Sequence, residues 1–409
     1  MARAFAIMRY RLSLLASAQT HMLKRIQLSS MEEVYMNQVR LAILIQILNS
    51  FVSGALTVIL PLMMKERSID IVTIGFVYAA MPLIFQLGRM LFAILSDFWG
   101  RKPFFILHGP LAVVSNLIYY VAQTPIQFLF GKVIEGTRDG SLWAVNRAFL
   151  MEHSENKWRV LVHLRTTNYV FLAIGSLLAG FLIVWLQYDG ALLTCTLIGA
   201  LVIPTSLLLI GGGRRKLNKA RALELLDFRK KQKTFKSLLI LFFVMGLSLG
   251  FVRNFVFPLF LSENGFDTQT IGLFLGLQIS LSGLFSYLLA GKTDIRRIML
   301  ISGALYIFVL VLLGISSGIM AGILTIAYGS AAGLLSIGQE GVLARITNKE
   351  SYGTDIGLLM MGLHSGRAVS LAASGFLISL LGFAAPFLTS AFVFTFFMFG
   401  VYLIPKMQL

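Results

Sequence analysis

Long, uninterrupted apolar runs are the feature that most restricts what this chain can fold into. We expect twelve of them to cross a bilayer as helices, because each is close to the ~20 residues that span its hydrocarbon core. The expected spans are residues 39–62, 72–95, 104–122, 127–146, 164–186, 190–211, 237–261, 268–290, 298–316, 319–341, 356–379 and 383–404. A membrane β-barrel would instead show alternating segments of about ten residues. The sequence therefore predicts an all-α polytopic membrane protein with twelve transmembrane helices.

Composition excludes several other classes of protein. The chain is 57% hydrophobic and 13% charged, whereas soluble domains carry about 25% charged residues. That leaves too little polar surface for a cytoplasmic enzyme of 409 residues, and too much apolar sequence for a disordered chain. Cys195 is the one cysteine, so neither an intrachain disulfide nor a cysteine-based metal site can form.

Basic residues gather on one side of the expected spans. Most of the 35 lysines and arginines fall in segments that share the side of the two termini, whereas the opposite loops hold Lys65 and Arg67. Because cytoplasmic loops carry the excess of positive charge, both termini and the central loop are expected in the cytoplasm of a cell in its plasma or inner membrane. The net charge of +17 is explained in the same way. We therefore expect no nucleic-acid partner.

The chain divides into four segments. Residues 37–211 and 237–409 each hold six expected spans, and residues 212–236 form a basic cytoplasmic linker. The linker is interpreted as a topology signal and solvated connection; binding to anionic lipid or to a partner is the alternative. Residues 1–36 form an N-terminal extension with apolar residues three or four apart. This extension is either an interfacial helix or the result of a start codon placed too far upstream.

An internal repeat relates the two halves. The stretch PLMMKERSIDIVTIG at residues 61–75 aligns with PLFLSENGFDTQTIG at residues 258–272, with seven identities in fifteen positions and a constant offset of 197. The same offset places Asp97 onto Asp294. Two homologous six-helix bundles, related by an axis along the membrane normal, are the organisation of one class of transporter. We therefore expect two pseudo-symmetric bundles.

The loop after the second expected span reads LSDFWGRK at residues 95–102. It resembles the signature loop of the major facilitator superfamily, Gly-x-Leu-Ala-Asp-Arg-x-Gly-Arg-Lys, and departs from it at Ala93 and Phe98. The second half keeps a degraded copy, GKTDIRR, at residues 291–297. The resemblance covers residues 37–409 and implies the twelve-helix fold of that superfamily and transport by alternating access.

A cytoplasmic gate is expected where this loop meets the inner helix ends. Asp97 is expected to pair with Arg147, and Asp294 with Arg345, while the cytoplasmic side is closed. Glu340 is expected to pair with Arg345. The expected gate residues are Asp97, Gly100, Arg101, Lys102, Arg147, Asp294, Arg297, Glu340 and Arg345. In the alternative interpretation, Arg101 and Lys102 only contribute to the charge bias of the topology.

The fourth expected span carries charged side chains inside the membrane. Lys132, Glu135, Asp139 and Trp143 are three or four residues apart and share one helical face, with Arg138 at its edge. Ionisable residues in a span are expensive and usually functional. We expect this face to form a substrate or proton pathway, with Asp139 as the proton carrier and Glu135 holding Arg138. An ion-pair ladder that only stabilises the bundle is the alternative.

Further pathway residues follow from the resemblance, which implies that the first, fourth, seventh and tenth spans line a central cavity. These spans contribute Asn49, Arg253 and Gln339, and the eleventh span adds Arg367. Arg253 could instead extend to the outer headgroups. The arginines favour a small polar, anionic solute.

The sequence thus predicts a proton-coupled secondary active transporter, working as a monomer on a small-molecule substrate in the lipid bilayer. Proton-exchange efflux of amphipathic compounds is the alternative within that class, and a non-transporting sensor or scaffold is the alternative outside it. Enzyme activity is not expected, because no phosphate-binding loop and no nucleophile elbow occurs. No cofactor and no metal is expected, since no His or Cys cluster has ligand spacing.

Overall fold

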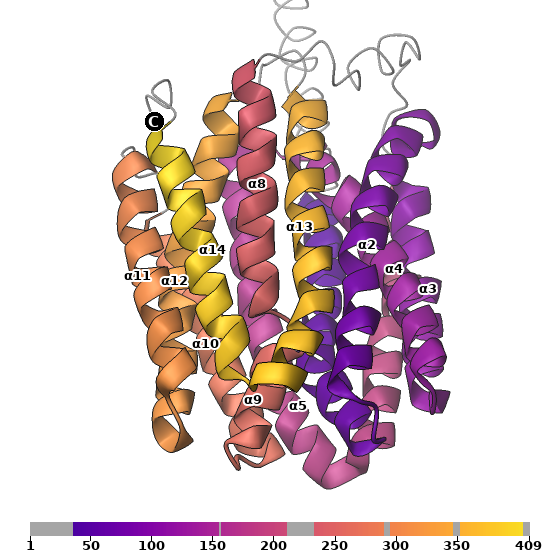
Figure 1. Cartoon of the computed structure of the whole chain (residues 1–409). Helices are drawn as coiled ribbons and strands as arrows, with labels where there is room; N and C mark the ends of the chain where they lie inside the picture. Colours follow the sequence, from indigo (N-terminus) through magenta and orange to yellow (C-terminus); the bar gives the residue numbers. More distant parts are fainter. Residues whose placement is uncertain (1–35, 155–156, 211–232, 290–294, 347–351, 404–409) are drawn as a thin grey trace, which may run out of the picture.

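The computed structural model describes residues 36–154, 157–210, 233–289, 295–346 and 352–403, and these parts are almost wholly helical (Figure 1). The first half has the first helix Met36–Glu66, α2 (Ile71–Trp99), α3 (Lys102–Val121), α4 (Pro125–Glu152), α5 (Lys157–Ala200) and α6 (Val202–Leu207). The second half has α8 (Lys233–Phe251), α9 (Val256–Glu263), α10 (Thr268–Leu288), α11 (Ile295–Ile315), α12 (Gly318–Ile346), α13 (Tyr352–Leu381) and α14 (Ala384–Leu403). Most of the N-terminal extension and of the basic linker lies outside the described residues.

Within the described residues, ten helices are long and apolar enough to cross a membrane. One of them, Arg159–Leu207, has 49 residues and is interrupted at Gln187, whose φ of 59° is non-helical. This break falls between the fifth and sixth expected spans. The helix α4 is not among the ten although it has 28 residues, because its window carries the charged face described above. The protein is thus a multi-pass helical membrane protein, and the number of twelve spans stays a prediction.

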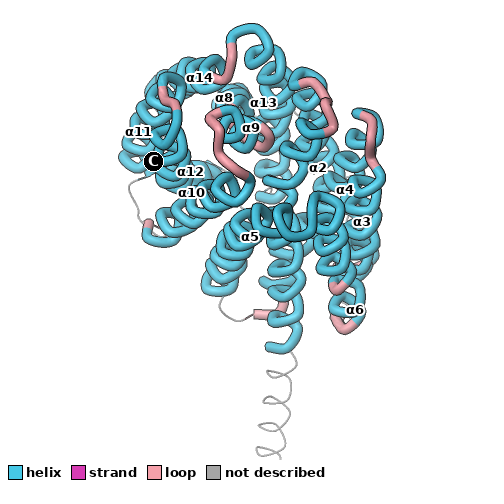
Figure 2. The backbone as a smooth tube through the Cα atoms, turned by 90° about the horizontal axis from the view of Figure 1, so that it is seen from below, coloured by secondary structure: helices cyan, strands magenta, loops and turns pink. Residues whose placement is uncertain are grey.

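The two halves contact each other along two helix pairs, α2 with α13 and α5 with α10 (Figure 2). Glycines allow a close approach at both seams. A Cβ atom at Gly75 would lie 2.8 Å from the carbonyl oxygen of Leu371, and one at Gly272 would lie 2.8 Å from that of Ser176. Gly75 and Gly272 are equivalent positions of the repeat, so the two seams are built alike.

The helices α2 and α10, which begin within the two copies of the repeat and lie at the two contacts between the halves, also share the same N-terminal cap. Asp70 accepts a hydrogen bond from the backbone N–H of Thr73 at 2.9 Å, and Asp267 accepts one from that of Thr270 at 2.8 Å. Each aspartate caps its helix by satisfying an N–H group that has no partner inside the helix. These hydrogen bonds hold the pKa of both carboxyl groups below the ordinary value of 3.8. We call this side of the molecule the Asp70 end and the opposite side the Asp97 end.

Candidate functional site

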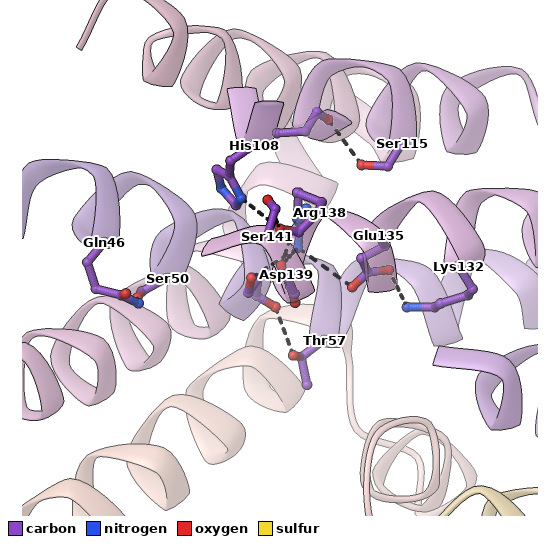
Figure 3. Close-up of polar contacts among 12 residues, drawn as sticks. Gln46, Ser50, Thr57, His108, Ser115, Lys132, Glu135, Arg138, Asp139 and Ser141 are labelled. Carbon is purple, nitrogen blue, oxygen red and sulfur yellow. Dashed lines mark hydrogen bonds and ion pairs between the residues drawn. The ribbon is translucent and has the colours of Figure 1, made fainter. Parts of the chain in front are cut away.

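Four charged side chains are buried on one face of α4, inside the first half (Figure 3). The Lys132 Nζ atom lies 2.7 Å from Glu135 Oε2, and the Arg138 Nη2 atom lies 2.8 Å from Asp139 Oδ1. A weaker contact of 3.9 Å joins Arg138 Nη2 to Glu135 Oε1. Two positive and two negative groups therefore balance one another within one helix.

Aromatic residues of α2 and α3 complete the surroundings of this charge cluster. The Tyr119 hydroxyl donates to Glu135 Oε2 at 2.5 Å, and Lys132 Nζ lies 4.4 Å from the ring centroid of Tyr78. On the other side of α4, the Arg138 carbonyl contacts His108 Nδ1 at 3.0 Å and accepts from the Ser141 hydroxyl at 2.7 Å. Burial of a charge is costly unless it is paired and hydrogen-bonded, and here partners come from α2, α3, α4 itself and the first helix, where the Ser53 hydroxyl accepts from Arg138 at 3.3 Å.

A network of amide and hydroxyl groups lies towards the Asp97 end of the same half. Asn146 donates to Gln46 at 2.8 Å, and Gln46 donates to Ser50 at 2.9 Å and to Asn168 at 3.1 Å. These residues connect the first helix with α4 and α5. Asn49, an expected pathway residue, is buried next to Ser50. The network is neutral and joins the helices of the first half.

A cavity of about 310 Å³ lies between the two halves, mainly against the second half. Polar and aromatic side chains from the first helix, α5, α9, α10, α12, α13 and the segment between α8 and α9 line it together with apolar ones. Its polar and aromatic lining consists of Thr57, Tyr169, Arg253, Asn254, Phe257, Gln278, Ser282, Tyr328, Ser336, Gln339 and Arg367. Three of the expected pathway residues, Arg253, Gln339 and Arg367, thus meet at one cavity, whereas the charge cluster of α4 does not line it.

The cavity is positively charged. Arg253 and Arg367 are its ionisable cations, and none of the described residues that line it is acidic. Neither guanidinium forms an ion pair with the described part of the chain, and the two repel each other. The Nε atom of Arg367 is buried and has no hydrogen-bond partner there. The cavity therefore has unused donors for an anion.

The signature loop forms a compact cluster at the Asp97 end. Asp97 contacts Arg101 at 2.8 Å, and Arg101 also reaches Glu152 at 3.4 Å. Lys102 donates to the carbonyl of Leu207 at 2.9 Å, and Gly100 has a φ of 85°, which suits glycine at the end of α2.

The expected pairing of Asp97 with Arg147 is wrong in this structure. Arg147 instead contacts Glu340 of α12 at 3.5 Å, across the two halves. Arg101 lies one helical turn from Asp97 and reaches it first. Asp294 and the side chain of Arg345 lie outside the described residues, as does the expected pairing between them.

Two further expected residues lie apart from these clusters. Trp143 is half-buried on α4 and does not line the cavity, and Arg297 is exposed near the start of α11. Sequence reasoning missed the tyrosines Tyr78, Tyr119, Tyr169 and Tyr328. Their hydroxyl or ring contacts depend on tertiary packing, so no periodicity within one helix could have identified them.

Comparison with known proteins places this arrangement in context. The model of the Major Facilitator Superfamily matches residues 42–337. Multidrug resistance protein MdtL of Klebsiella pneumoniae subsp. pneumoniae is 25% identical over 231 residues, which is 54% of this chain and 58% of that protein. The match thus spans less than two thirds of this curated relative.

Solved structures are similar over most of the chain. A mutant of the nucleoside transporter NupG has a TM-score of 0.74 at 15% identity, and the human organic anion transporter MFSD10 has 0.67 at 16%. Each comparison covers 90% of this chain and 99% of the other. At such identities the likeness shows the fold alone. With the family model matching well over half of the sequence, the chain belongs to the major facilitator superfamily.

Proposed function

We propose that this chain is a secondary active transporter that carries a small anionic solute by alternating access of its two halves. The observation that carries this proposal is the cavity between the halves, which presents Arg253 and Arg367 and has no acidic residue among its described lining. The likeness to transporter structures supports the mode of action, and the charge of the cavity supports the class of solute.

The contrast between the two polar regions argues for an anion. In the α4 cluster every charge has an opposite partner within 4 Å, so no ligand is needed to balance it. The two cavity arginines lack such partners among the described residues, and uncompensated charge inside a membrane protein is expensive. A guanidinium group matches the geometry of carboxylate and phosphate. A solute with one or two such groups would neutralise the cavity.

The size and lining of the cavity fit a small solute. About 310 Å³ lies at the lower end of the range for ligand sites. Gln278 and Gln339 add neutral donors and acceptors, and the rings of Phe257 and Tyr328 pack at 4.8 Å on one wall. Hydroxyl groups or an apolar part of the solute could be recognised there.

We further propose that proton coupling runs through the α4 cluster. Asp139 has one cationic partner, Arg138, within 3 Å, whereas Glu135 is held by Lys132 and Tyr119. Asp139 is therefore the carboxylate more easily released by a shift of a single side chain. The assignment of Asp139 as proton carrier, rather than Glu135, keeps the role expected from the sequence.

The gate is proposed at the Asp97 end. The contact between Arg147 and Glu340 joins α4 to α12, and both side chains are partly solvent-exposed. The contacts of Asp97 and Arg101 stay within the first half and fix the loop from which α3 begins. On the charge bias of the loops we place this end, with both termini, in the cytoplasm of a plasma or inner membrane.

Export of amphipathic compounds is the second candidate. The apolar share of the cavity lining, including Met245, Leu249 and Leu275, and the partial match to a multidrug resistance protein favour it. The two arginines would then select anionic rather than cationic amphipathic compounds.

Counterflow in proteoliposomes tests the proposal. Radiolabelled succinate, inorganic phosphate and glucose 6-phosphate serve as anions, uridine as a neutral solute and tetraphenylphosphonium as a lipophilic cation. We expect exchange of at least one anion, lost in Arg367→Gln and Arg253→Gln and partly kept in Arg367→Lys. The exposed Arg40, changed to Gln, is the matched control. Exchange of uridine or tetraphenylphosphonium that is unaffected by Arg367→Gln would overturn the anionic assignment.

A further inference from the structure

A third arginine lies beside the cavity, between its lining and the Asp97 end. Arg165 of α5 is half-buried, and its Nη2 atom donates to the Ser336 hydroxyl of α12 at 2.8 Å. Its guanidinium carbon lies 6.0 Å from the ring centroid of Tyr169. Both Ser336 and Tyr169 line the cavity. Arg165 therefore touches two walls of the cavity, one from each half of the molecule.

Arg165 has no negative partner in the described part of the chain. Its recorded contacts are a hydroxyl and an aromatic ring, and neither neutralises a guanidinium group. The hydroxyl is itself engaged elsewhere, since Ser336 lies 2.9 Å from Ser286 of α10 and bonds the carbonyl of Gly333 at 2.7 Å. The bond to Arg165 is thus one that Ser336 can lose while its other contacts persist.

The three arginines follow one another along the transport axis. Arg253 follows the end of α8 at the Asp70 side, Arg367 lies near the middle of α13, and Arg165 lies near the start of α5 at the Asp97 side. They come from α5, from α13 and from the segment between α8 and α9, and so from both halves. Arg165 therefore lies against the cavity lining on the side that faces the Asp97 end.

We propose that Arg165, beside Tyr169, forms a second anion-binding position on the Asp97 side of the cavity, which the solute occupies by displacing the Ser336 hydroxyl from the guanidinium group. This inference rests on the anionic solute of the proposed function. A carboxylate or phosphate oxygen forms an ion pair with the guanidinium in which both partners are charged, and this is stronger than the bond to the uncharged Ser336 hydroxyl that it replaces. The exchange breaks a contact between α5 and α12, so arrival of the anion loosens the closure of the halves.

A purely structural role for Arg165 makes a different prediction. If the contact only held the halves together, Arg165→Gln and Ser336→Ala would weaken the same bond and have similar effects. If Arg165 binds the anion, Ser336→Ala removes a competitor and leaves the guanidinium in place. The two variants separate the two roles.

The test is the KM for succinate, inorganic phosphate and glucose 6-phosphate in oriented proteoliposomes, measured separately from each side. We expect Arg165→Gln to raise the KM from the Asp97 side about tenfold, the loss of one charge-assisted hydrogen bond. The KM from the Asp70 side should change less than about twofold. Arg165→Lys should fall between wild type and Gln, and Ser336→Ala, which keeps the guanidinium group, should raise the KM from the Asp97 side much less than Arg165→Gln does.

Each other outcome counts against the inference. Equal losses in Arg165→Gln and Ser336→Ala would show a structural contact and overturn it, while the anionic cavity would stand on Arg253 and Arg367. Equal KM changes from both sides would place Arg165 in the first site and also overturn it. If the wild-type protein moves none of the three anions, the proposed function fails first and the second position fails with it.

Discussion

Lys65 donates a hydrogen bond to the hydroxyl of Ser262 at 3.0 Å, and these two residues occupy the same position in the internal repeat. A residue that contacts its own repeat equivalent must lie beside the axis that relates the two halves. Lys65 also reaches Glu263 at 3.8 Å. The pseudo-symmetry axis therefore leaves the molecule between the first helix and α9, at the Asp70 end.

A reversible crosslink at this contact should stop transport. Lys65→Cys and Ser262→Cys, in a Cys195→Ser background, would be joined by a bifunctional thiol reagent that spans the length of the lysine side chain. Because alternating access requires the halves to separate at this end, we expect exchange to fall at least tenfold and to recover after reductive cleavage. Either single cysteine with the same reagent is the control, and full exchange in the crosslinked protein would contradict rocking about this axis.

A methyl group at the glycine seam should weaken closure of the Asp70 end. Gly75→Ala places a Cβ atom 2.8 Å from the Leu371 carbonyl oxygen, and overpacking of this kind costs about 1–3 kcal/mol. We expect a lower unfolding temperature and slower exchange. Gly357→Ala is the matched control, since a Cβ atom there meets nothing within 4 Å. Equal behaviour of the two variants would show that the seam tolerates the extra atom.

Proton coupling can be separated from exchange at Asp139. Asp139→Asn keeps the size of the side chain and removes the charge that pairs with Arg138. Counterflow needs no net proton movement, so we expect it to persist while accumulation driven by a pH gradient is lost. Accumulation at the wild-type rate would remove Asp139 from the proton path. Loss of folding in the variant would favour the structural role of the cluster.

The acid dependence of stability should depend partly on the two helix caps. The pKa of Asp70 and Asp267 is lowered in the folded protein, mainly by the hydrogen bonds to Thr73 and Thr270. The contribution is therefore fully present above the ordinary pKa of 3.8 and is lost as the pH falls through the lower folded value. Asp70→Ala should lower the free energy of unfolding by about 1 kcal/mol at neutral pH. It should also make the unfolding temperature fall less steeply as the pH is lowered into the acid range. An unchanged fall of the unfolding temperature in acid would exclude the cap as its source.

The orientation of the chain is open to direct labelling. Single cysteines at Ser68 and Ser317, exposed at the Asp70 end, should react with an impermeant thiol reagent added outside cells. A cysteine at Ser237, exposed near the start of α8 at the Asp97 end, should react only after permeabilisation. The reverse pattern would invert the assigned topology.

The multi-pass helical character of the chain and the charged face of α4 were predictable from the sequence because both depend on local spacing, whereas the number of twelve spans stays a prediction. The contact of Lys132 with Glu135 follows from a separation of three residues on one helix. The repeat likewise predicted that Asp70 and Asp267 occupy equivalent positions. Length and periodicity are properties of single segments, and a single sequence contains them.

The partners of charges between helices were not predictable in the same way. Asp97 was expected to reach Arg147, but Arg101 lies nearer and Arg147 contacts Glu340 of the other half. That Arg253 and Arg367 share a cavity with no acidic residue among its described lining depends on how α13 packs against α8 and the segment that follows it. Such pairings are set by tertiary geometry, which sequence spacing alone does not specify.

The uncompensated guanidinium charges have a consequence for energetics. A dianionic solute would cancel the charges of Arg253 and Arg367, so the loaded carrier would reorient with almost no charge movement. The empty carrier would move positive charge through part of the electric field, at about 2.3 kcal/mol per charge for a full crossing of 100 mV. A voltage negative at the Asp97 end would therefore favour the conformation in which the empty, positively charged cavity opens to that end. The membrane potential, independently of any proton gradient, would determine which conformation the unloaded protein mainly populates.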